Sequence, residues 1–186
     1  MKFFSNIVES IAGGIMDWTA RSGRTQTVVI DHELRGVAPD MITWWWDNID
    51  TTERYKLWHP KDHISFEWVV PPKDGHVGAI QKVRERVAGI SFTFLIRWED
   101  PESISGDFQF TLSAAVIGND GSVRSRLTHE YESAPYGTRM RSSFIVPASA
   151  PGFFVKGLKR HNREEMQCFC DFLPELYRQE VEKRGK

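Results

Sequence analysis

PGFFVKGLKRHNREEMQCFCDFLPELY, residues 151–177, is the stretch that decides how this sequence can fold. At steps of three or four residues, one helical face collects Phe154, Leu158, His161, Glu165, Phe169 and Phe172. The spacing predicts a long helix whose buried face carries a histidine and a carboxylate one turn apart. Pro174 is expected to kink or end this helix.

Two explanations are open for His161 and Glu165. A buried carboxylate is unfavourable unless a positive group pairs with it. A divalent metal is one such partner, because the pattern His-x-x-x-Glu places two ligand side chains side by side on a helix. Alternatively, the two side chains form a hydrogen-bonded pair at the edge of the stripe, near solvent. The pair alone does not decide between these explanations.

The rest of the chain is expected to form one domain with this helix. Residues 1–24 are predicted to be a short helix and a connector, residues 25–150 a sheet with an inserted Trp-rich helix, and residues 151–186 the long helix and a tail. The inserted helix is expected to present Met41, Trp44 and Trp45 to the interior. About six strands with alternating polarity precede the long helix, which indicates an α+β fold with an antiparallel sheet. A curved sheet around this helix would enclose a cavity, and seven Trp and twelve Phe suit an aromatic lining.

Composition excludes several kinds of partner. The net charge of -1 gives no reason to expect nucleic acid or an anionic membrane surface as a partner. No apolar run approaches the ~20 residues of a membrane span. Cys168 and Cys170 point in different directions on one helix and are not expected to bridge each other, which suits a reducing, cytoplasmic location.

Several ionisable residues fall on the inward faces of predicted strands. Glu85 lies between Val83 and Val87 in an alternating segment, so its carboxylate is expected to face the interior. His129 shares a face with Tyr131 in a later strand. His32, in the first strand, is interpreted as a core or cavity-wall histidine rather than a ligand.

The loop YKLWHPKDH, residues 55–63, offers a further ligand from either His59 or His63. Asp62 in the same loop could orient a ligating imidazole through a hydrogen bond. Histidines and carboxylates facing one interior suit zinc or another divalent ion, and a bound metal would activate water and polarise a carbonyl. The combination indicates metal-assisted hydrolysis or acyl transfer.

Four segments together are similar to a known family: MITWWWDNI (41–49), YKLWHPKDH (55–63), QKVRERVAG (81–89) and RHNREE (160–165). They resemble the 2,4-diacetylphloroglucinol hydrolase and phloretin hydrolase family. The resemblance implies a Bet v 1-like (START-like) helix-grip fold. It also implies a zinc-dependent hydrolase that cleaves the carbon–carbon bond between a polyphenol ring and an acyl carbonyl. A small phenolic molecule would be the substrate.

The resemblance also implies roles for particular residues. Family members bind zinc through a loop histidine, a strand glutamate and the helical pair, which match His63, Glu85, His161 and Glu165. His63 keeps the family's spacing from Tyr55, whereas His59 does not. Tyr55 would be a phenol that contacts the substrate, and His129 would act on the ring or its hydroxyl. A homodimer is a further expectation.

Two other functions compete with the hydrolase. Folds of this kind also bind apolar molecules without transforming them, so the alternative is a carrier for small apolar or phenolic ligands. A third interpretation is an aromatic cyclase-like or regulatory domain with the same cavity. Within the hydrolase interpretation, Tyr131 either handles a proton with His129 or only lines the cavity.

Overall fold

The computed structural model describes residues 23–73, 75–101 and 107–182. Within these ranges, seven strands form one antiparallel sheet in the order β1-β7-β6-β5-β4-β3-β2. They are β1 (Thr25–Arg35), β2 (His63–Val70), β3 (Ile80–Val87), β4 (Ile90–Glu99), β5 (Phe110–Ile117), β6 (Val123–Ala134) and β7 (Gly137–Pro147). The helices are α2 (Pro39–Asn48), α3 (Thr52–Trp58), α4 (Gly152–Tyr177) and η2 (Arg178–Glu182). The helix predicted at the N-terminus lies outside the described residues.

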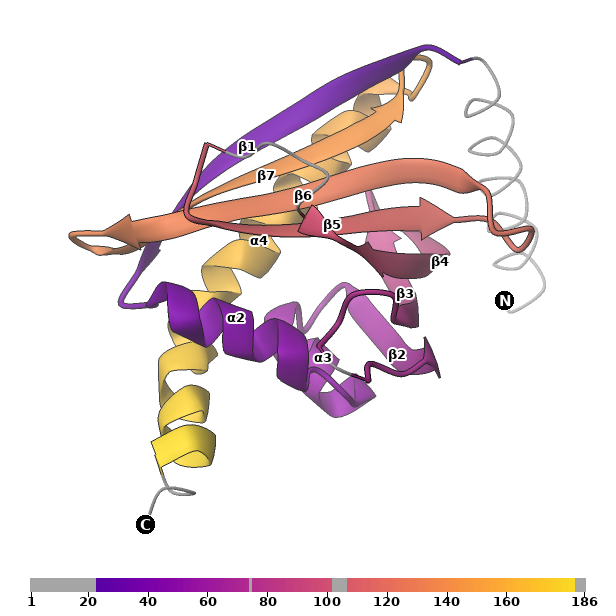
Figure 1. The fold of residues 1–186 in the computed structure, drawn as a ribbon. Coiled ribbons are helices and arrows are strands. Elements are labelled where there is room, and N and C mark those ends of the chain that lie inside the picture. The colour runs from indigo at the N-terminus through magenta and orange to yellow at the C-terminus, as the bar shows by residue number, and fades with distance from the viewer. Residues whose placement is uncertain (1–22, 74, 102–106, 183–186) are drawn as a thin grey trace.

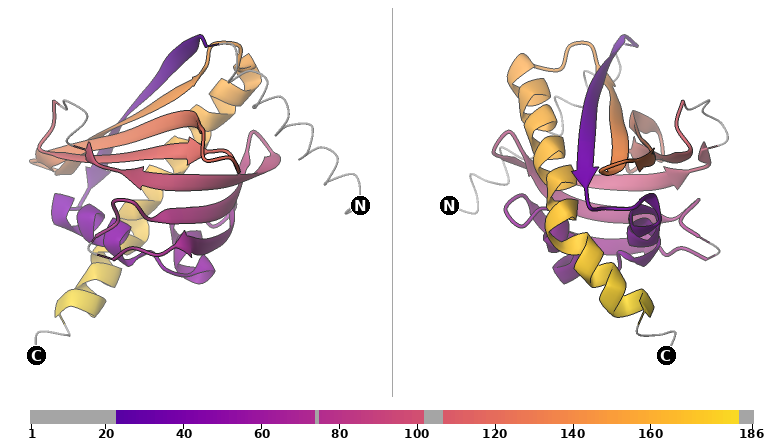
Figure 2. Two further views of the ribbon diagram at one scale, coloured as in Figure 1. Left: turned by 45° about the vertical axis from the view of Figure 1, so that its right-hand side comes forward. Right: turned by 90° about the vertical axis from the view of Figure 1, so that its left-hand side faces the viewer.

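The curved sheet packs along one side of α4, and the C-terminal end of this helix extends beyond the strands, as Figures 1 and 2 show. The helix contacts β1 at one edge of the sheet and β3 near the other, while α2 and α3 pack against its C-terminal half. Alternation explains the strands: Val28, Ile30 and Leu34 of β1 are buried, and the residues between them are more exposed. The predicted α+β class, with an antiparallel sheet around a long helix, is confirmed.

One close contact sets how near α4 lies to the β3–β4 turn. Ala88 and Gly89 form this turn with positive φ angles of 55° and 80°, as a two-residue hairpin connection requires. A Cβ placed on Gly157 of α4 would lie 2.5 Å from the Cβ of Ala88. Only glycine therefore lets the helix approach the turn this closely.

Two apolar clusters fill the space between the sheet and the helices. The larger one joins α2, α3 and the C-terminal half of α4 to the sheet, and the smaller one centres on Val28, Ile30 and Val146. In α2, the buried side chains are Ile42, Trp45 and Trp46, whereas the sequence pattern pointed to Met41, Trp44 and Trp45. The helix is therefore rotated relative to that expectation, and it contacts both α4 and β6.

Three details differ from the sequence-based expectations. The segment before Pro60 is not a loop throughout, since α3 forms there with the Thr51 side chain accepting a hydrogen bond from the Arg54 N–H. The sheet has seven strands rather than about six. Helix α4 does not end at Pro174 but runs on to Tyr177, whose ring packs edge-on against Trp44 at 5.5 Å.

In the part of the chain that the structure describes, no helix has the length and apolar character of a membrane span. The cytoplasmic location and the homodimer stay predictions.

Candidate active site

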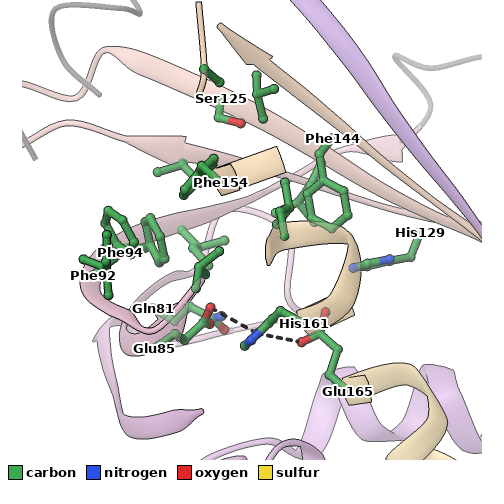
Figure 3. A pocket seen from close by; sticks show the side chains of 18 of the residues that line it. Gln81, Glu85, Phe92, Phe94, Ser125, His129, Phe144, Phe154, His161 and Glu165 are labelled. Atoms are coloured by element: carbon green, nitrogen blue, oxygen red, sulfur yellow. Dashed lines mark ion pairs between the residues drawn. The ribbon is translucent and has the colours of Figure 1, made fainter. Parts of the chain in front are cut away.

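A cavity of about 260 Å³ lies between the sheet and α4. Its walls are mostly aromatic and aliphatic side chains, as Figure 3 shows for Phe92, Phe94 and Phe144. The polar side chains that reach it are those of Tyr55, Gln81, Glu85, Ser125, His129, His161 and Glu165. Pockets of this kind, apolar with a few polar groups, are typical of sites for small organic ligands.

The pairing of β2 with β3 and the turn of α4 bring the four predicted ligand residues together. His63 is the Cα partner of Glu85 across the two strands. His161 and Glu165 are four residues apart on α4 and face these strands. Glu165 Oε2 lies 3.4 Å from His63 Nε2 and 3.6 Å from His161 Nε2, and Glu85 Oε2 lies 3.7 Å from His161 Nε2. Figure 3 shows His161 between the two carboxylates.

Hydrogen-bond directions distinguish His63 from His59. The Nδ1 of His63 lies 3.0 Å from the carbonyl oxygen of Tyr55, so Nδ1 must donate, and Nε2 is the ring nitrogen that faces Glu165. In His59, Nδ1 accepts a hydrogen bond from the Asp62 N–H at 3.3 Å. The proton of neutral His59 therefore sits on Nε2, which lies 3.3 Å from Glu164 Oε2. The two rings therefore differ in what they face: Nε2 of His63 faces Glu165 of the predicted ligand set, whereas Nε2 of His59 faces Glu164.

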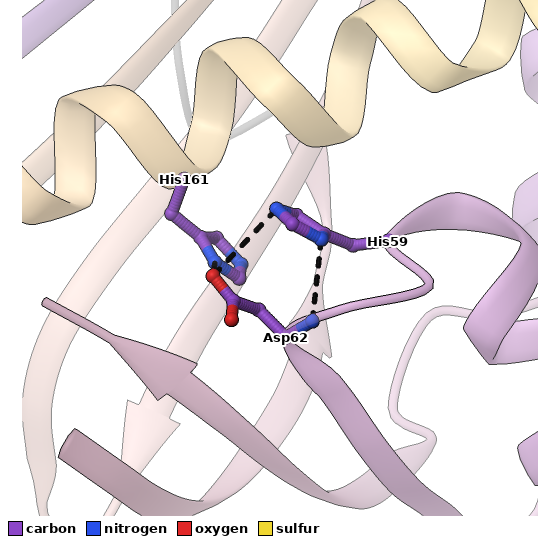
Figure 4. A group of neighbouring side chains, drawn as sticks. All are labelled: His59, Asp62 and His161. Atoms are coloured by element: carbon purple, nitrogen blue, oxygen red, sulfur yellow. Dashed lines mark hydrogen bonds and ion pairs between the residues drawn. The ribbon is translucent and has the colours of Figure 1, made fainter. Parts of the chain in front are cut away.

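Asp62 orients His161 from the side away from the cavity. Its Oδ2 lies 3.5 Å from His161 Nδ1, and the His59 ring stacks on the His161 ring at 4.6 Å (Figure 4). Burial opposes a charge on His161, but Glu165, Glu85 and Asp62 outweigh it and raise the pKa of the imidazole. A carboxylate behind a histidine in this way fixes the ring and makes its other nitrogen a better metal ligand. His59, Asp62 and His161 also form a second, smaller group that could hold an ion.

Glu165 is ionised in this setting. Its burial would raise the pKa of the carboxyl, but the contact from His63 and the charge of His161 reverse that effect and hold the pKa at about 2. The Asn162 side-chain amide also donates a hydrogen bond to Oε1 at 2.7 Å. The other oxygen, Oε2, is thus left to face His63 and His161.

Three buried ring nitrogens of the site are available as ligand atoms. His63 Nε2 and both ring nitrogens of His161 are buried and make no hydrogen bond within residues 23–73, 75–101 and 107–182. Unsatisfied polar atoms of this kind are rare in folded proteins and call for an explanation. Because His63, His161 and Glu165 place their ligand atoms within 4.8 Å of one another, these residues fit a metal ion.

The hydroxyl of Tyr55 is hydrogen-bonded to the carboxylate of Glu85. Tyr55 is buried, its ring stacks on His63 at 3.9 Å with an interplanar angle of 5°, and its hydroxyl donates a hydrogen bond to Glu85 Oε1. Burial and the neighbouring Glu85 raise its pKa well above the ordinary value, so the phenol keeps its proton. Contact of Tyr55 with a substrate stays a prediction.

His129 and Tyr131 point to different places although they share one face of β6. His129 lines the cavity, stacks on Trp46 at 5.7 Å, and places Nδ1 2.9 Å from Ser142 Oγ. Its burial lowers the pKa to about 4, so the ring is neutral near pH 7. The Tyr131 hydroxyl instead lies 2.9 Å from Thr43 Oγ1 in α2, and Tyr131 is not among the cavity-lining residues.

Three polar residues at or near the site were not predicted. Gln81 reaches the cavity and accepts a hydrogen bond from Trp98 Nε1 at 3.2 Å. Asn162 and Ser142 are fully buried and hydrogen-bonded to Glu165 and to His129. Asn162 could have been found from its spacing, since it lies three residues before Glu165 on the same helix.

The family model described as DAPG hydrolase PhiG domain matches residues 16–150. This match covers well over half of the 186-residue chain. The chain belongs to the DAPG hydrolase PhiG domain family. The matched residues of this PhiG domain include Tyr55, His63, Glu85 and His129, whereas α4 lies beyond them. Membership indicates a hydrolase of phloroglucinol-type substrates.

Solved structures show the fold of the PhiG domain. Ara h 8.0201 is 16% identical, with a TM-score of 0.58 over 82% of this chain and 99% of that one. A START superfamily protein from Mycobacterium smegmatis is 15% identical, with a TM-score of 0.56 over 82% and 98% of the two chains. The expected Bet v 1-like (START-like) helix-grip fold is therefore confirmed. No curated protein matches this sequence.

Proposed function

We propose that this PhiG domain is a zinc-dependent hydrolase that cleaves the carbon–carbon bond between a polyphenol ring and an acyl carbonyl. The observation that supports this most is the set of buried, unpartnered imidazole nitrogens facing Glu165 and Glu85 beside an apolar cavity. Family membership supports the hydrolase class and the phloroglucinol type of substrate.

The metal would be held by His63, Glu85, His161 and Glu165, with zinc as the expected ion and other divalent ions able to use the same donors. Zinc bound there would supply Lewis acidity, lowering the pKa of a water toward ~7 and polarising a carbonyl. Three other side chains fix the orientation of these ligands. Tyr55 holds Glu85, Asp62 holds His161 and Asn162 holds Glu165, each through a contact to the atom that does not face the site.

The cavity wall would bind the substrate and exclude bulk water. Trp46, Trp58 and Phe144 offer flat apolar surfaces for a phenolic ring. Overall, water adds to the acyl carbonyl and the bond to the ring carbon breaks. The acyl group leaves as a carboxylic acid, and the ring carbon gains a proton. His129 lines the cavity outside the ligand set, and it would face the ring or its hydroxyl.

A carrier for apolar or phenolic ligands is the second candidate, because most of the cavity wall is apolar. A carrier, however, has no use for two histidines and two carboxylates buried together, since apolar side chains would be more stable there. The carrier therefore explains the walls of the cavity but not its polar end.

Metal analysis and an activity assay test the proposal together. Protein purified without a histidine tag is expected to hold about one zinc per chain, and Glu165→Gln little or none. Wild-type protein with zinc is expected to hydrolyse diacetylphloroglucinol or phloretin, followed by loss of substrate absorbance. Metal-free wild-type protein that binds these phenols unchanged and hydrolyses neither of them would favour the carrier.

A further inference from the structure

A chain of hydrogen-bonding side chains links Glu165 to His129 through the sheet. Asn162 Nδ2 lies 2.7 Å from Glu165 Oε1, and Asn162 Oδ1 lies 3.0 Å from His32 Nε2. His32 Nε2 is 3.1 Å from Ser142 Oγ, which is 2.9 Å from His129 Nδ1. The chain crosses α4, β1, β7 and β6, and its three middle members have no role in the proposed function beyond the contact of Asn162 with Glu165.

The donor and acceptor of the first two hydrogen bonds in this chain follow from the carboxylate of Glu165. Asn162 Nδ2 donates to Glu165 Oε1, because a carboxylate oxygen is a hydrogen-bond acceptor and the NH₂ group is the donor of the amide. The atom facing His32 is then the amide oxygen, which also only accepts. His32 Nε2 must therefore carry a hydrogen and donate it to Asn162.

The direction continues through Ser142. Because His32 Nε2 is a donor, the hydroxyl hydrogen of Ser142 cannot point at it. The other side-chain partner of Ser142 among the described residues is His129 Nδ1. Ser142 therefore donates to His129 Nδ1, and the proton of the neutral His129 ring sits on Nε2. Nε2 is the nitrogen left for the cavity that His129 lines, and Figure 3 shows this ring extending from its strand toward the cavity interior.

We propose that Asn162, His32 and Ser142 are positioning residues that hold His129 in the tautomer protonated at Nε2, so that His129 donates a hydrogen bond to an oxygen of the acylphenol. The choice of an acylphenol oxygen rests on the proposed function, but the tautomer does not. A neutral imidazole N–H can polarise a carbonyl in this way. His129 thus acts as a donor to the substrate and not as a base, since its unprotonated nitrogen is occupied by Ser142.

Nitrogen NMR of the histidine rings tests the tautomer without any substrate. In ¹⁵N-labelled protein as purified, at neutral pH, His129 is expected to show a protonated Nε2 and an unprotonated Nδ1. Its signals are assigned as those missing from His129→Gln. Ser142→Ala is expected to shift the Nδ1 resonance of His129. Ser143→Ala, the same change at the next residue of β7, is the control and is expected to leave this resonance unchanged. A ring protonated at Nδ1, or an Nδ1 signal indifferent to Ser142→Ala, overturns the inference.

Two substitutions of His129 test the donor role. The amide of His129→Gln can place an N–H where Nε2 was, whereas that of His129→Asn reaches only the position of Nδ1. We expect kcat on an acylphloroglucinol to fall about a hundredfold in His129→Asn and no more than about tenfold in His129→Gln. Equal losses would overturn the donor role. A wild-type protein that hydrolyses no acylphenol would instead remove the proposed function, and the NMR result would still decide the tautomer.

Discussion

Tyr55 donates its hydroxyl hydrogen to Oε1 of Glu85, and the other oxygen of that carboxylate faces His161 Nε2 at 3.7 Å. The two residues come from α3 and β3, and the stacking of the Tyr55 ring on His63 ties the same tyrosine to the neighbouring strand β2. One buried phenol thus contacts two of the four proposed metal ligands. Tyr55 would therefore support the proposed metal site as well as form part of the cavity wall.

Tyr55→Phe is therefore expected to weaken zinc binding about 10- to 100-fold, because Glu85 loses the bond that holds it. Competition with a zinc chelator measures this affinity. Tyr131→Phe is the matched control, since its hydroxyl pairs with Thr43 outside the cavity lining, and we expect it to leave zinc affinity unchanged. Unaltered zinc affinity in Tyr55→Phe, with weaker phenol binding, would make Tyr55 a substrate contact only.

The pH dependence of stability should report the charge of Glu165 in the metal-free protein. The folded-state pKa of this carboxyl, about 2, lies below its ordinary value of 4.5, so the folded state binds fewer protons between these values. The stability that this shift contributes is present above pH 4.5 and is lost as the pH falls toward 2. It amounts to roughly 3 kcal/mol.

Urea denaturation at a series of pH values, with zinc removed by a chelator, measures this contribution. Wild-type stability is expected to fall more steeply with acid than that of Glu165→Gln, which has no charge to lose. Glu164→Gln serves as the control, because its side chain is 47% exposed and should behave like wild type. Parallel curves for wild type and Glu165→Gln would mean that the carboxyl titrates normally.

Gly157→Ala tests the contact between α4 and the β3–β4 turn. Helix propensity alone predicts that alanine stabilises α4 by about 1 kcal/mol. The added Cβ would instead meet the Ala88 Cβ, so we expect a net loss of about 1–3 kcal/mol and a lower Tm. Adding Ala88→Gly should recover part of this loss, because it removes the clashing methyl and relieves the positive φ of 55°. A higher Tm for Gly157→Ala alone would contradict the close approach.

Leu127→Trp tests whether the cavity is the ligand site. Leu127 lines the cavity two residues before His129 on β6, so a larger ring there should occupy the space of a phenolic ligand. We expect at least about tenfold weaker binding of phloroglucinol derivatives by calorimetry, with zinc content preserved. Leu57→Trp, a change at a residue of α3 that is 43% exposed, is the control. Full affinity in Leu127→Trp would place the ligand elsewhere.

Much of the candidate site was predictable because it depends on local geometry. Helical spacing placed His161 and Glu165 on one face of α4, and both are buried there. Strand alternation predicted that Glu85 faces the interior, and in the structure its side chain lines the cavity. Aromatic residues were harder to place, since Trp46 rather than Trp44 is buried and stacks on His129. The rotation of a short helix depends on what packs on both sides of it.

The sequence by itself determined which residues share a face, because the periods of helix and strand are properties of the local backbone. Only the tertiary structure decided which faces meet: the register that sets His63 opposite Glu85, and the placement of α4 that brings His161 to both. It also gave His59 and His63 different hydrogen-bond partners, whereas the choice of His63 as a metal ligand stays a prediction. Both lie beside His161, but the Tyr55 carbonyl accepts a hydrogen bond from Nδ1 of His63, whereas Nδ1 of His59 accepts one from the Asp62 N–H. Spacing along the chain carries no information about such partners, because they are supplied by the way the backbone folds around each ring.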